Sequence, residues 1–373
     1  MFSKKKYSLY NNIYFSGLLL ITLGTLFVLS SSFFYGIEKN DPTVYFEKHI
    51  LYLIFGLIAV YILQKINLKK IEEYSFFIFI LTLILLPLPK IQGNLRWIKI
   101  GPFSFQPSEF VKLTYIIYLS SYFKKRIKEI NNLKIMSIPA FFWILISCLL
   151  QLQKDFGTFV IITFSFVFIL YFCGFKLKYI FSFLGFFLLL VCIFILMFPY
   201  RIERIKIYLN PEQDTLGKNY QTIQAKISLS SGGLFGKGPG AGTGKLKFLP
   251  EAHKDFVYAV VGEEFGFFGT AGVLILFGIL IFSGLEISKL SLELFEKILA
   301  YGISILFGLQ FLLHTSVVLC LLPPKGTTLP FFSVGGSSLL MNLLSFGLLL
   351  KISENVKNQK SSKDIEEKIL YLK

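Results

Sequence analysis

Residues 249–256, Leu-Pro-Glu-Ala-His-Lys-Asp-Phe, concentrate ionisable side chains immediately before a long apolar run. Ionisable groups at membrane depth are costly in free energy, so they are functional candidates wherever they occur. A carboxylate at such a half-dry boundary acts as a general base if burial raises its pKa, or binds a divalent cation through oxygen. We therefore take Asp255 as the candidate catalytic residue; the alternative is a helix N-cap without chemistry.

Four cations lie on short loops that the span count places outside the membrane, where lysine and arginine are under-represented. They are Arg96, Lys99, Lys154 and Lys325. One interpretation is scattered, solvated charges. The functional interpretation is that they converge on an anionic ligand, because arginine binds phosphate as a bidentate fork and lysine as a point charge. A pyrophosphate attached to a lipid would suit such a cluster.

Acidic residues inside or beside apolar runs have two interpretations each. Glu109 and Lys112 are three residues apart and share a helix face, so they form a structural ion pair, or Lys112 faces a ligand while Glu109 tunes it. Asp155 precedes an apolar run and is a helix N-cap or a site residue. Glu263 and Glu264 lie deep in a predicted span, where we expect one of them to bond to a neighbouring helix.

Two segments are unusually rich in residues that favour irregular backbone. Residues 232–244 are glycine-rich but lack the spacing of a nucleotide-binding P-loop, so their glycines admit a ligand close to the backbone or simply allow movement. Residues 323–338 combine proline, glycine and hydroxyl side chains. Irregular backbone at membrane depth is tolerated only where it lines protein or a water-filled cavity. The second segment therefore points to a site.

The elements that must position these residues are membrane helices. The chain has 373 residues, of which 54% are hydrophobic, with a mean hydropathy of +0.66, and many apolar runs approach the length of about 20 residues that spans a bilayer. This predicts an all-α polytopic membrane protein. The net charge of +16 fits lysine and arginine in cytoplasmic loops better than nucleic-acid binding. The four cysteines and three histidines lack the spacing of a disulfide framework or a zinc site.

The apolar pattern predicts about ten spans, with both termini cytoplasmic and one long extracytoplasmic loop, 199–255, between spans seven and eight. The expected parts are a cytoplasmic N-terminus at 1–12, a membrane domain at 13–350 and a basic cytoplasmic tail at 351–373. The predicted spans are 13–35, 45–63, 74–89, 106–123, 135–152, 157–172, 179–198, 256–284, 297–322 and 334–350.

Four blocks, in order, resemble the SEDS family (shape, elongation, division, sporulation), which includes FtsW and RodA. The resemblance covers about residues 90–350, and ten spans is the count of the family. The blocks are Arg96-Trp97-Ile98 through Gln106-Pro107-Ser108-Glu109-Phe110-Val111-Lys112-Leu113, then Asp155-Phe156-Gly157-Thr158, residues 249–256 and residues 325–338.

The resemblance implies a peptidoglycan glycosyltransferase that polymerises lipid II, the undecaprenyl-pyrophosphate-linked disaccharide-peptide, at the outer face of the cytoplasmic (inner) membrane. Asp255 would deprotonate the 4-hydroxyl of the acceptor sugar, directly or with a divalent cation such as Mg or Mn. Outer cations, including Arg96 and Lys112, would stabilise the pyrophosphate leaving group. The implied substrate-binding residues are Arg96, Trp97, Glu109, Lys112, Asp155, His253, Lys325, Ser333 and Ser337.

Within the family, residues 250–253 and 325–330 resemble FtsW, the septal member, more than RodA. This favours a role in cell division over elongation, with a class B penicillin-binding protein transpeptidase and divisome or elongasome proteins as implied partners and no nucleic acid. A flippase of lipid-linked precursor and a non-catalytic scaffold are the competing functions. The chain departs from the family pattern at Lys154, where proline is usual, Lys254, where threonine is usual, and Val334, where tyrosine is usual. The two extra cations would depress the pKa of a neighbouring aspartate.

Overall fold

The computed structural model describes residues 2–100, 103–130, 132–197, 202, 208, 220–244, 249–323 and 326–359. Helices dominate this part of the chain, as the sequence predicts. The exception is a short antiparallel hairpin of β1 (Ile98–Ile100) and β2 (Phe103–Phe105), in which Ile98 pairs with Phe105. The sequence predicts only an outer loop in this segment, because two strands of three residues leave too short a pattern to detect.

The helices follow one another with short connections until residue 197. Their bounds are α1 (Phe2–Ile37), α2 (Val44–Lys65), α3 (Leu68–Glu73), α4 (Ser75–Leu85), α5 (Leu88–Ile91), α6 (Pro107–Arg126), the 3₁₀ turn η1 (Ile127–Glu129), α7 (Leu133–Leu152), α8 (Phe156–Phe172), α9 (Leu177–Met197), α11 (Tyr220–Ser231), α12 (Ala252–Asp255), α13 (Val257–Leu290), α14 (Leu294–Val318) and α15 (Gly336–Asn358).

Helices occupy all ten predicted spans, with differences at their ends. α1 begins at Phe2, well before the predicted start at 13, and α15 runs to Asn358, past the predicted end at 350. The third span is divided into α4 and α5 at Pro87, because proline lacks the N–H that a helix interior requires. The predicted long loop contains α11 and α12.

Among the described residues, seven helices are long and apolar enough to cross a membrane: α1, α2, α7, α9, α13, α14 and α15. The apolar stretches at Ser75–Ile91 and Phe156–Phe172 are shorter. The helix α6 has the length of a membrane span but is less apolar than these seven helices, and 16 of its 20 residues are buried. Its hydroxyls bond to other protein groups; for example, Tyr115 donates to the carbonyl of Pro139 at 2.9 Å. A helix enclosed by other helices needs no lipid-facing side chains, so its hydropathy is low.

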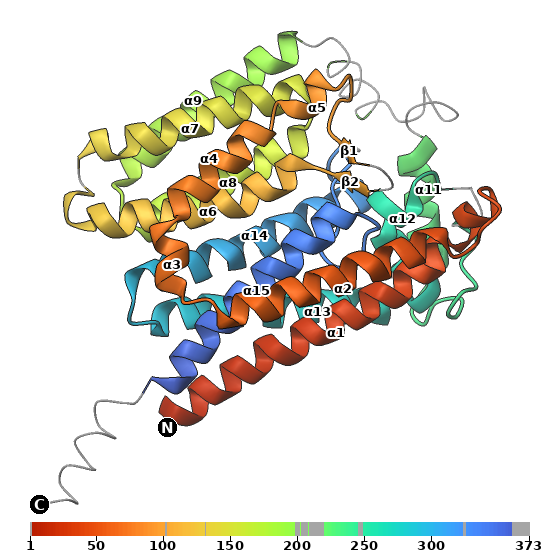
Figure 1. The fold of residues 1–373 in the computed structure, drawn as a ribbon. Coiled ribbons are helices and arrows are strands. Elements are labelled where there is room, and N and C mark those ends of the chain that lie inside the picture. The colour runs from red at the N-terminus through yellow and green to blue at the C-terminus, as the bar shows by residue number, and fades with distance from the viewer. Residues whose placement is uncertain are drawn as a thin grey trace, which may run out of the picture.

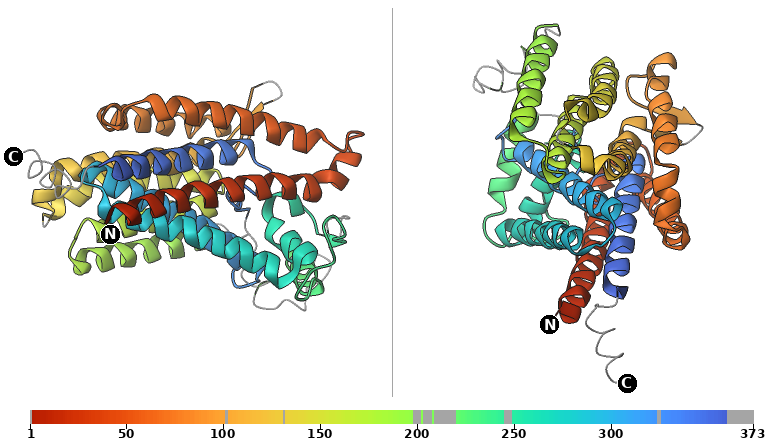
Figure 2. Two further views of the ribbon diagram at one scale, coloured as in Figure 1. Left: turned by 90° about the horizontal axis from the view of Figure 1, so that it is seen from below. Right: turned by 90° about the vertical axis from the view of Figure 1, so that its left-hand side faces the viewer.

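The helices form two groups that α14 joins. In Figure 1, α4, α6, α7, α8 and α9 lie together in one group, while α1, α2, α13 and α15 form the other. α14 packs against α6 and α8 on one side and against α13 on the other. Figure 2 shows the long helices running roughly side by side along one direction.

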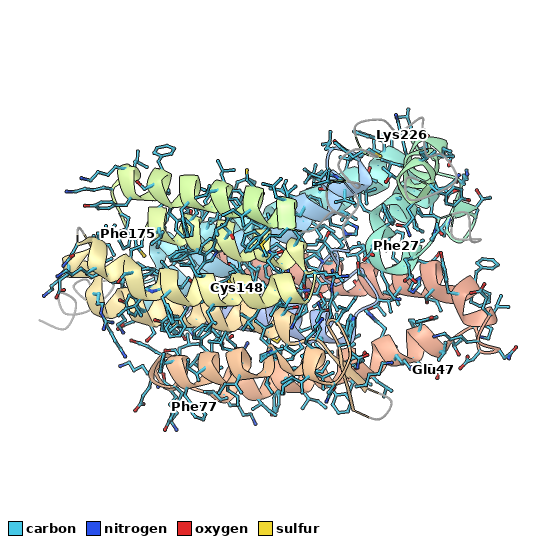
Figure 3. All side chains as sticks on the ribbon, turned by 90° about the horizontal axis from the view of Figure 1, so that it is seen from above. Phe27, Glu47, Phe77, Cys148, Phe175 and Lys226 are labelled. Carbon is cyan, nitrogen blue, oxygen red and sulfur yellow. The ribbon has the colours of Figure 1, made fainter. Side chains whose placement is uncertain are left out.

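Apolar side chains fill the space between the helices. Phe27 of α1 lies inside, where its ring is 5.3 Å from Phe265 and 5.8 Å from Phe332, whereas Phe77 is exposed at the edge of the bundle (Figure 3). Exposed apolar side chains are frequent on the outer helices, with Phe77 and Phe282 among them. This is the pattern expected where lipid rather than water covers the surface.

The two ends of the bundle are formed by different segments of the chain. α12, the β-hairpin and α11 lie at one end, and the start of α1 and the end of α15 lie at the other (Figure 1). Figure 2 shows the same separation from two further directions. The candidate residues on these connecting segments are therefore brought to the end remote from both termini.

Candidate functional site

Asp255 is the last residue of α12, a single turn between the long loop and α13. The turn begins after Glu251, whose φ of 55° places it in the left-handed region. The N-cap of α13 is Phe256, and it makes no side-chain capping bond. Asp255 therefore does not cap α13, which removes the structural alternative considered for it. Within the described residues, no hydrogen bond or ion pair engages its carboxylate, and the side chain remains partly exposed.

The surroundings make Asp255 a stronger base than an ordinary aspartate. Burial raises its pKa from 3.8 to about 6; the charge of Glu251 also raises it, while Lys254 and Arg96 oppose the rise. At pH 7 the group is still mostly deprotonated, and its proton affinity is higher than usual. A general base is most effective when its pKa lies close to the working pH. The extra cation Lys254 moderates this pKa, as the sequence suggested, but burial outweighs it.

Two segments distant in sequence come near Asp255: the charge of Arg96 lowers its pKa, and the backbone of Gly326 approaches its carboxylate. Arg96 is held by the turn between α7 and α8, where its Nη2 donates to the Lys154 carbonyl at 2.5 Å and its Nε to the Gln153 carbonyl at 3.2 Å. Gly326 lies on the other segment, and a Cβ there would be 3.3 Å from Asp255 Oδ2. The backbone at Gly326 thus lies next to the carboxylate with no side chain between them.

His253 is buried behind Asp255. Its ring is only 1% exposed and lies between Tyr35 of α1 and Tyr45 of α2, with ring centroids 4.5 and 5.0 Å away. Burial lowers its pKa to about 4, with a further contribution from Lys254, so the imidazole is neutral at pH 7. Its carbonyl accepts from the Val334 N–H at 2.9 Å. These contacts join α12 to α1, α2 and residues 326–335; the predicted substrate contact stays a prediction.

Asp155 is fully engaged with protein partners. Its Oδ1 caps α8 by accepting from the Thr158 N–H at 3.2 Å, and its Oδ2 accepts from the hydroxyls of Thr158 and Ser108 at 3.0 and 3.1 Å and from Gln106 Nε2 at 3.3 Å. The N-cap interpretation is therefore the one observed. The same carboxylate also fastens the start of α6 to the start of α8.

Ser333 and Ser337 both serve the backbone. Ser333 Oγ accepts from the Leu329 N–H at 2.8 Å. Ser337 Oγ accepts from the Gln106 N–H at 2.9 Å and donates to the Ser104 carbonyl at 3.4 Å. Both residues are buried. They shape residues 326–337 and attach this segment to β2, next to Asp255.

Glu109 and Lys112 form a buried ion pair one turn inside α6. The Lys112 Nζ is 2.9 Å from Glu109 Oε2, and the two side chains are 4% and 7% exposed. The structural interpretation of this pair is the one the geometry supports, and a role of Lys112 toward a ligand stays a prediction. Trp97 is partly exposed next to β1, and Lys325 lies outside the described residues.

Glu263 and Glu264 find partners inside the protein. Glu264 Oε1 accepts from Ser30 of α1 at 2.6 Å, which confirms the expected bond to a neighbouring helix. The other partners come from residues 232–244, named here the glycine strap. The strap N–H groups thus bind the carboxylates of the chain itself.

Asp255 does not belong to a cluster of metal-ligating side chains within the described residues. In the residues that the structure describes, no three histidine, cysteine, aspartate or glutamate side chains come together. The nearest acid in sequence, Glu251, is paired with Lys254 at 2.6 Å. A single carboxylate fits only the kind of Mg site that substrate oxygens and water complete.

Sequence reasoning missed several residues that build the site. Gln106 and Ser108 stood inside a recognised block, and their polar types next to Pro107 were a usable signal. His314, which is fully buried, bonds through Nδ1 to the Thr327 carbonyl at 2.7 Å and supports the turn that carries Gly326. Tyr35 and Tyr45 gave no signal, because their partner His253 is more than two hundred residues away in sequence.

This fold and site define a polytopic helical membrane protein whose polar segments converge at one end on a single half-buried carboxylate. Residues 10–358 match the sequence model of the FtsW/RodA/SpoVE family, described as cell cycle proteins. The chain belongs to this family.

Relatives in the family have similar length. A probable peptidoglycan glycosyltransferase FtsW of Borreliella burgdorferi is 36% identical over 351 residues, covering 91% of this chain and 95% of that protein. Another with the same description, of Coxiella burnetii, is 37% identical over 357 residues, covering 91% and 94%. Stage V sporulation protein E of Bacillus subtilis is 34% identical over 346 residues, covering 90% and 94%.

Solved structures share the fold. A chain from a study of how a peptidoglycan synthase complex coordinates polymerization and crosslinking superposes with a TM-score of 0.75 at 27% identity, covering 93% of this chain and 98% of that one. The rod shape determining protein RodA of Thermus thermophilus superposes with a TM-score of 0.67 at 24% identity, covering 93% and 97%.

Proposed function

We propose that this protein is a peptidoglycan glycosyltransferase that polymerises lipid II into glycan strands. The observation that carries the proposal is the half-buried Asp255, whose pKa is raised to about 6 and whose carboxylate has no partner within the described residues. The names of its relatives, which describe probable peptidoglycan glycosyltransferases, support the same reaction.

In the proposed reaction Asp255 takes the proton of the acceptor 4-hydroxyl. The freed oxygen attacks the anomeric carbon of the donor sugar, and the bond from that carbon to the lipid pyrophosphate breaks with its electron pair on the pyrophosphate. The new glycosidic bond thus forms as the old bond to phosphate is lost. The guanidinium of Arg96, already held near Asp255 by two backbone carbonyls, is placed to stabilise the anionic leaving group.

We propose that all ten helical segments span the membrane, with α12 and the β-hairpin on the outer side and both termini in the cytoplasm. The three segments beyond the seven strongly apolar helices are α4 with α5, α6 and α8. Support comes from the placement of the start of α1 and the end of α15 at the end remote from α12 and from the basic last turn of α6. An even number of spans is what places both termini on one side.

A divalent cation would be held by Asp255 together with oxygens of the bound pyrophosphate. Magnesium is commonly bound by one or two carboxylates plus substrate phosphates, which matches the single protein donor here. When bound, it would neutralise developing negative charge on the leaving group. The cation is a proposal that a chelator titration tests.

We further propose that the protein acts at the septum, with a class B penicillin-binding protein as partner. The FtsW descriptions of its relatives favour division over elongation. The superposition on a chain from a peptidoglycan synthase complex that coordinates polymerization and crosslinking favours a crosslinking partner. Complementation of an FtsW or a RodA depletion strain tests the assignment, and rescue of elongation alone would contradict it.

The decisive experiment is polymerisation of purified lipid II by the protein with its cognate partner, with and without chelator. Wild type is expected to make glycan chains, and Asp255→Ala is expected to make none while eluting as folded protein. Precursor transport by both proteins without any polymer would instead establish a flippase. Normal growth supported by Asp255→Ala at normal expression would establish a scaffold.

A further inference from the structure

The helical hydrogen bonding of α13 is interrupted at Gly266, and the glycine strap supplies partners for the backbone groups that lose theirs. Gly266 has φ 65° and ψ −156°, which lie outside the helical region. In an unbroken helix the carbonyls of residues 263 and 264 would accept from the N–H groups of residues 267 and 268. Here the N–H groups of residues 267 and 268 donate instead to the carbonyls of strap residues 233 and 234, at 2.9 and 3.2 Å. The carbonyls of residues 263 and 264 accept from the N–H groups of strap residues 237 and 238, at 2.9 and 3.0 Å.

The Glu263 carboxylate holds the far end of the strap. Oε1 accepts from Lys237 Nζ at 2.7 Å and from the Thr243 N–H and hydroxyl at 2.8 and 2.9 Å, while Oε2 accepts from the Gly244 N–H at 3.0 Å. The Glu263 side chain is 1% exposed. A buried carboxylate is costly unless it is paired and hydrogen-bonded, and the strap supplies both a cation and backbone donors.

The contact leaves no room for a Cβ at two positions of the strap. A Cβ at Gly244 would lie 2.0 Å from Ser228 Oγ and 2.9 Å from Glu263 Oε2. At Gly236, which has φ 80°, a Cβ would lie 2.2 Å from the Glu264 carbonyl oxygen. Glycine is therefore required at both positions for the strap to approach α13 this closely.

A chain of contacts leads from Glu263 to Asp255. The Gly244 carbonyl accepts from the Leu249 N–H at 2.8 Å, so the residue that Glu263 holds also holds Leu249. The Leu249 carbonyl accepts from the Tyr35 hydroxyl at 2.5 Å, and Leu249 is fully buried. Leu249 is two residues before Glu251, where α12 begins its single turn to Asp255.

We propose that Glu263 and Lys237 are positioning residues for Asp255, acting through the glycine strap. Within the described residues, every hydrogen bond to the Glu263 carboxylate comes from the strap, so its influence on Asp255 passes through Gly244 and Leu249. These hydrogen bonds, named here the Glu263 clamp, fix the start of α12 relative to α13 and so keep the Asp255 carboxylate next to the backbone of Gly326. The catalytic part of this inference rests on the proposed function; the mechanical part does not.

The first test measures polymerisation of lipid II by Glu263→Gln and Lys237→Met. A misplaced catalytic group lowers turnover more than binding, so we expect the turnover number to fall about tenfold with the apparent KM changed less than about twofold. A loosened α12 also exposes Asp255 to water, which moves the acid limb of the pH–rate profile to lower pH. Glu286→Gln is the matched control. Glu286 lies on α13 like Glu263 but away from the strap, and it pairs with Lys5 of α1 and Lys289 of α13.

A purely structural role gives a different outcome. Activity would then fall only in proportion to the folded fraction on size-exclusion chromatography, and the acid limb would stay in place. That result, or wild-type behaviour of both variants, overturns the inference.

The second test does not depend on activity. Hydrogen exchange of the amides in residues 249–256 is expected to be faster in Glu263→Gln than in wild type, and unchanged in Glu286→Gln. Unchanged exchange in Glu263→Gln would refute the clamp even if the enzyme is impaired. If wild type makes no polymer at all, the proposed function fails while this measurement still decides the mechanical link.

Discussion

Asp155 and Asp255 have similar sequence surroundings but differ in whether their carboxylates have hydrogen-bond partners. Each follows a polar turn and precedes an apolar helix. Asp155 accepts from four donors and closes the contact between α6 and α8. Asp255 has no hydrogen-bonded partner within the described chain, and burial raises its pKa to about 6. A satisfied carboxylate stabilises the fold, whereas an unsatisfied one is available for a substrate.

The comparison extends to the pH dependence of stability. The pKa of Asp255 is higher in the folded protein than the ordinary 3.8, so its contribution to stability is fully present below pH of about 4 and is lost as pH rises through about 6. Its activity as a base has the opposite dependence and appears above pH of about 6. At its working pH this residue therefore costs the fold free energy.

The largest effect is expected from Asp255→Asn. Loss of the base should lower polymerisation about a thousandfold, the middle of the range for general acid–base catalysis. The same change should raise the free energy of unfolding at pH 8 by up to about 3 kcal/mol, because a rise in pKa from 3.8 to about 6 has that equivalent. Turnover of radiolabelled lipid II measures the expected loss of polymerisation, and thermal unfolding at pH 5 and 8 measures the expected gain in stability at the higher pH. An inactive variant that is also less stable at pH 8 would contradict this account of Asp255.

Asp155→Ala should act mainly on stability. It leaves the Thr158 N–H and the hydroxyls of Thr158 and Ser108 without their acceptor, while Gln106 keeps its bond to Ser108. Each unsatisfied buried group costs about 1–3 kcal/mol, so the loss should exceed about 2 kcal/mol. The control is Asn132→Ala, an exposed N-cap of α7 that should cost about 1 kcal/mol or less. Thermal unfolding in detergent measures both. Equal losses would mean that the Asp155 network adds nothing beyond capping.

Arg96→Gln should lower turnover and move the acid limb of the pH–rate profile slightly upward. Removing the guanidinium removes a charge proposed to stabilise the leaving group, so turnover should fall several-fold at every pH. It also removes the smallest of the charge effects on the pKa of Asp255, so the acid limb itself should rise only slightly. Lys99→Gln, at an exposed position of the adjacent strand, is the control and should leave turnover and the limb in place. Turnover lowered equally by both changes would indicate a general surface-charge effect.

The smallest losses of turnover are expected at Lys254 of α12 and at Glu251, which precedes it. Lys254→Thr removes a charge that lowers the pKa of Asp255, so the acid limb should rise; Glu251→Gln removes one that raises it, so the limb should fall. Each shift should be about half a pH unit or less, because both side chains are largely solvated and screened. The opposite signs make the pair its own control. Shifts in the same direction would show that the changes act through the backbone of α12.

Much of the fold could be predicted because apolar runs of membrane length are a strong local signal. The helix containing Lys112 was recovered from its flanking proline and cationic end, although its polar composition hides it from hydropathy. The β1–β2 hairpin could not be predicted from two strands of three residues. The helical start at Phe2 was missed because polar residues with good helix propensity extend a span without raising its hydropathy.

The sequence predicted the site as a set of residue types. The structure adds which of these side chains already have hydrogen-bond partners within the protein and which do not. Asp255 and Arg96 could be selected from the sequence because both are charged groups close to the end of a span, and their roles in the reaction stay predictions. Sequence alone could not distinguish Asp155 from Asp255, since the difference lies in donors contributed by Ser108 and Gln106 from another helix. The link from Glu263 to Leu249 runs through backbone N–H groups, which leave no residue-type signal.

The turn at Lys154 limits how this protein can exchange residues with its relatives. Lys154 has φ 58°, and its carbonyl receives the guanidinium of Arg96. Proline, which the resemblance to the family leads one to expect at this position, has φ fixed near −65° and cannot adopt this conformation. Replacing Lys154 with proline by itself would therefore redirect that carbonyl and release Arg96, so proline is compatible only with a turn of different shape.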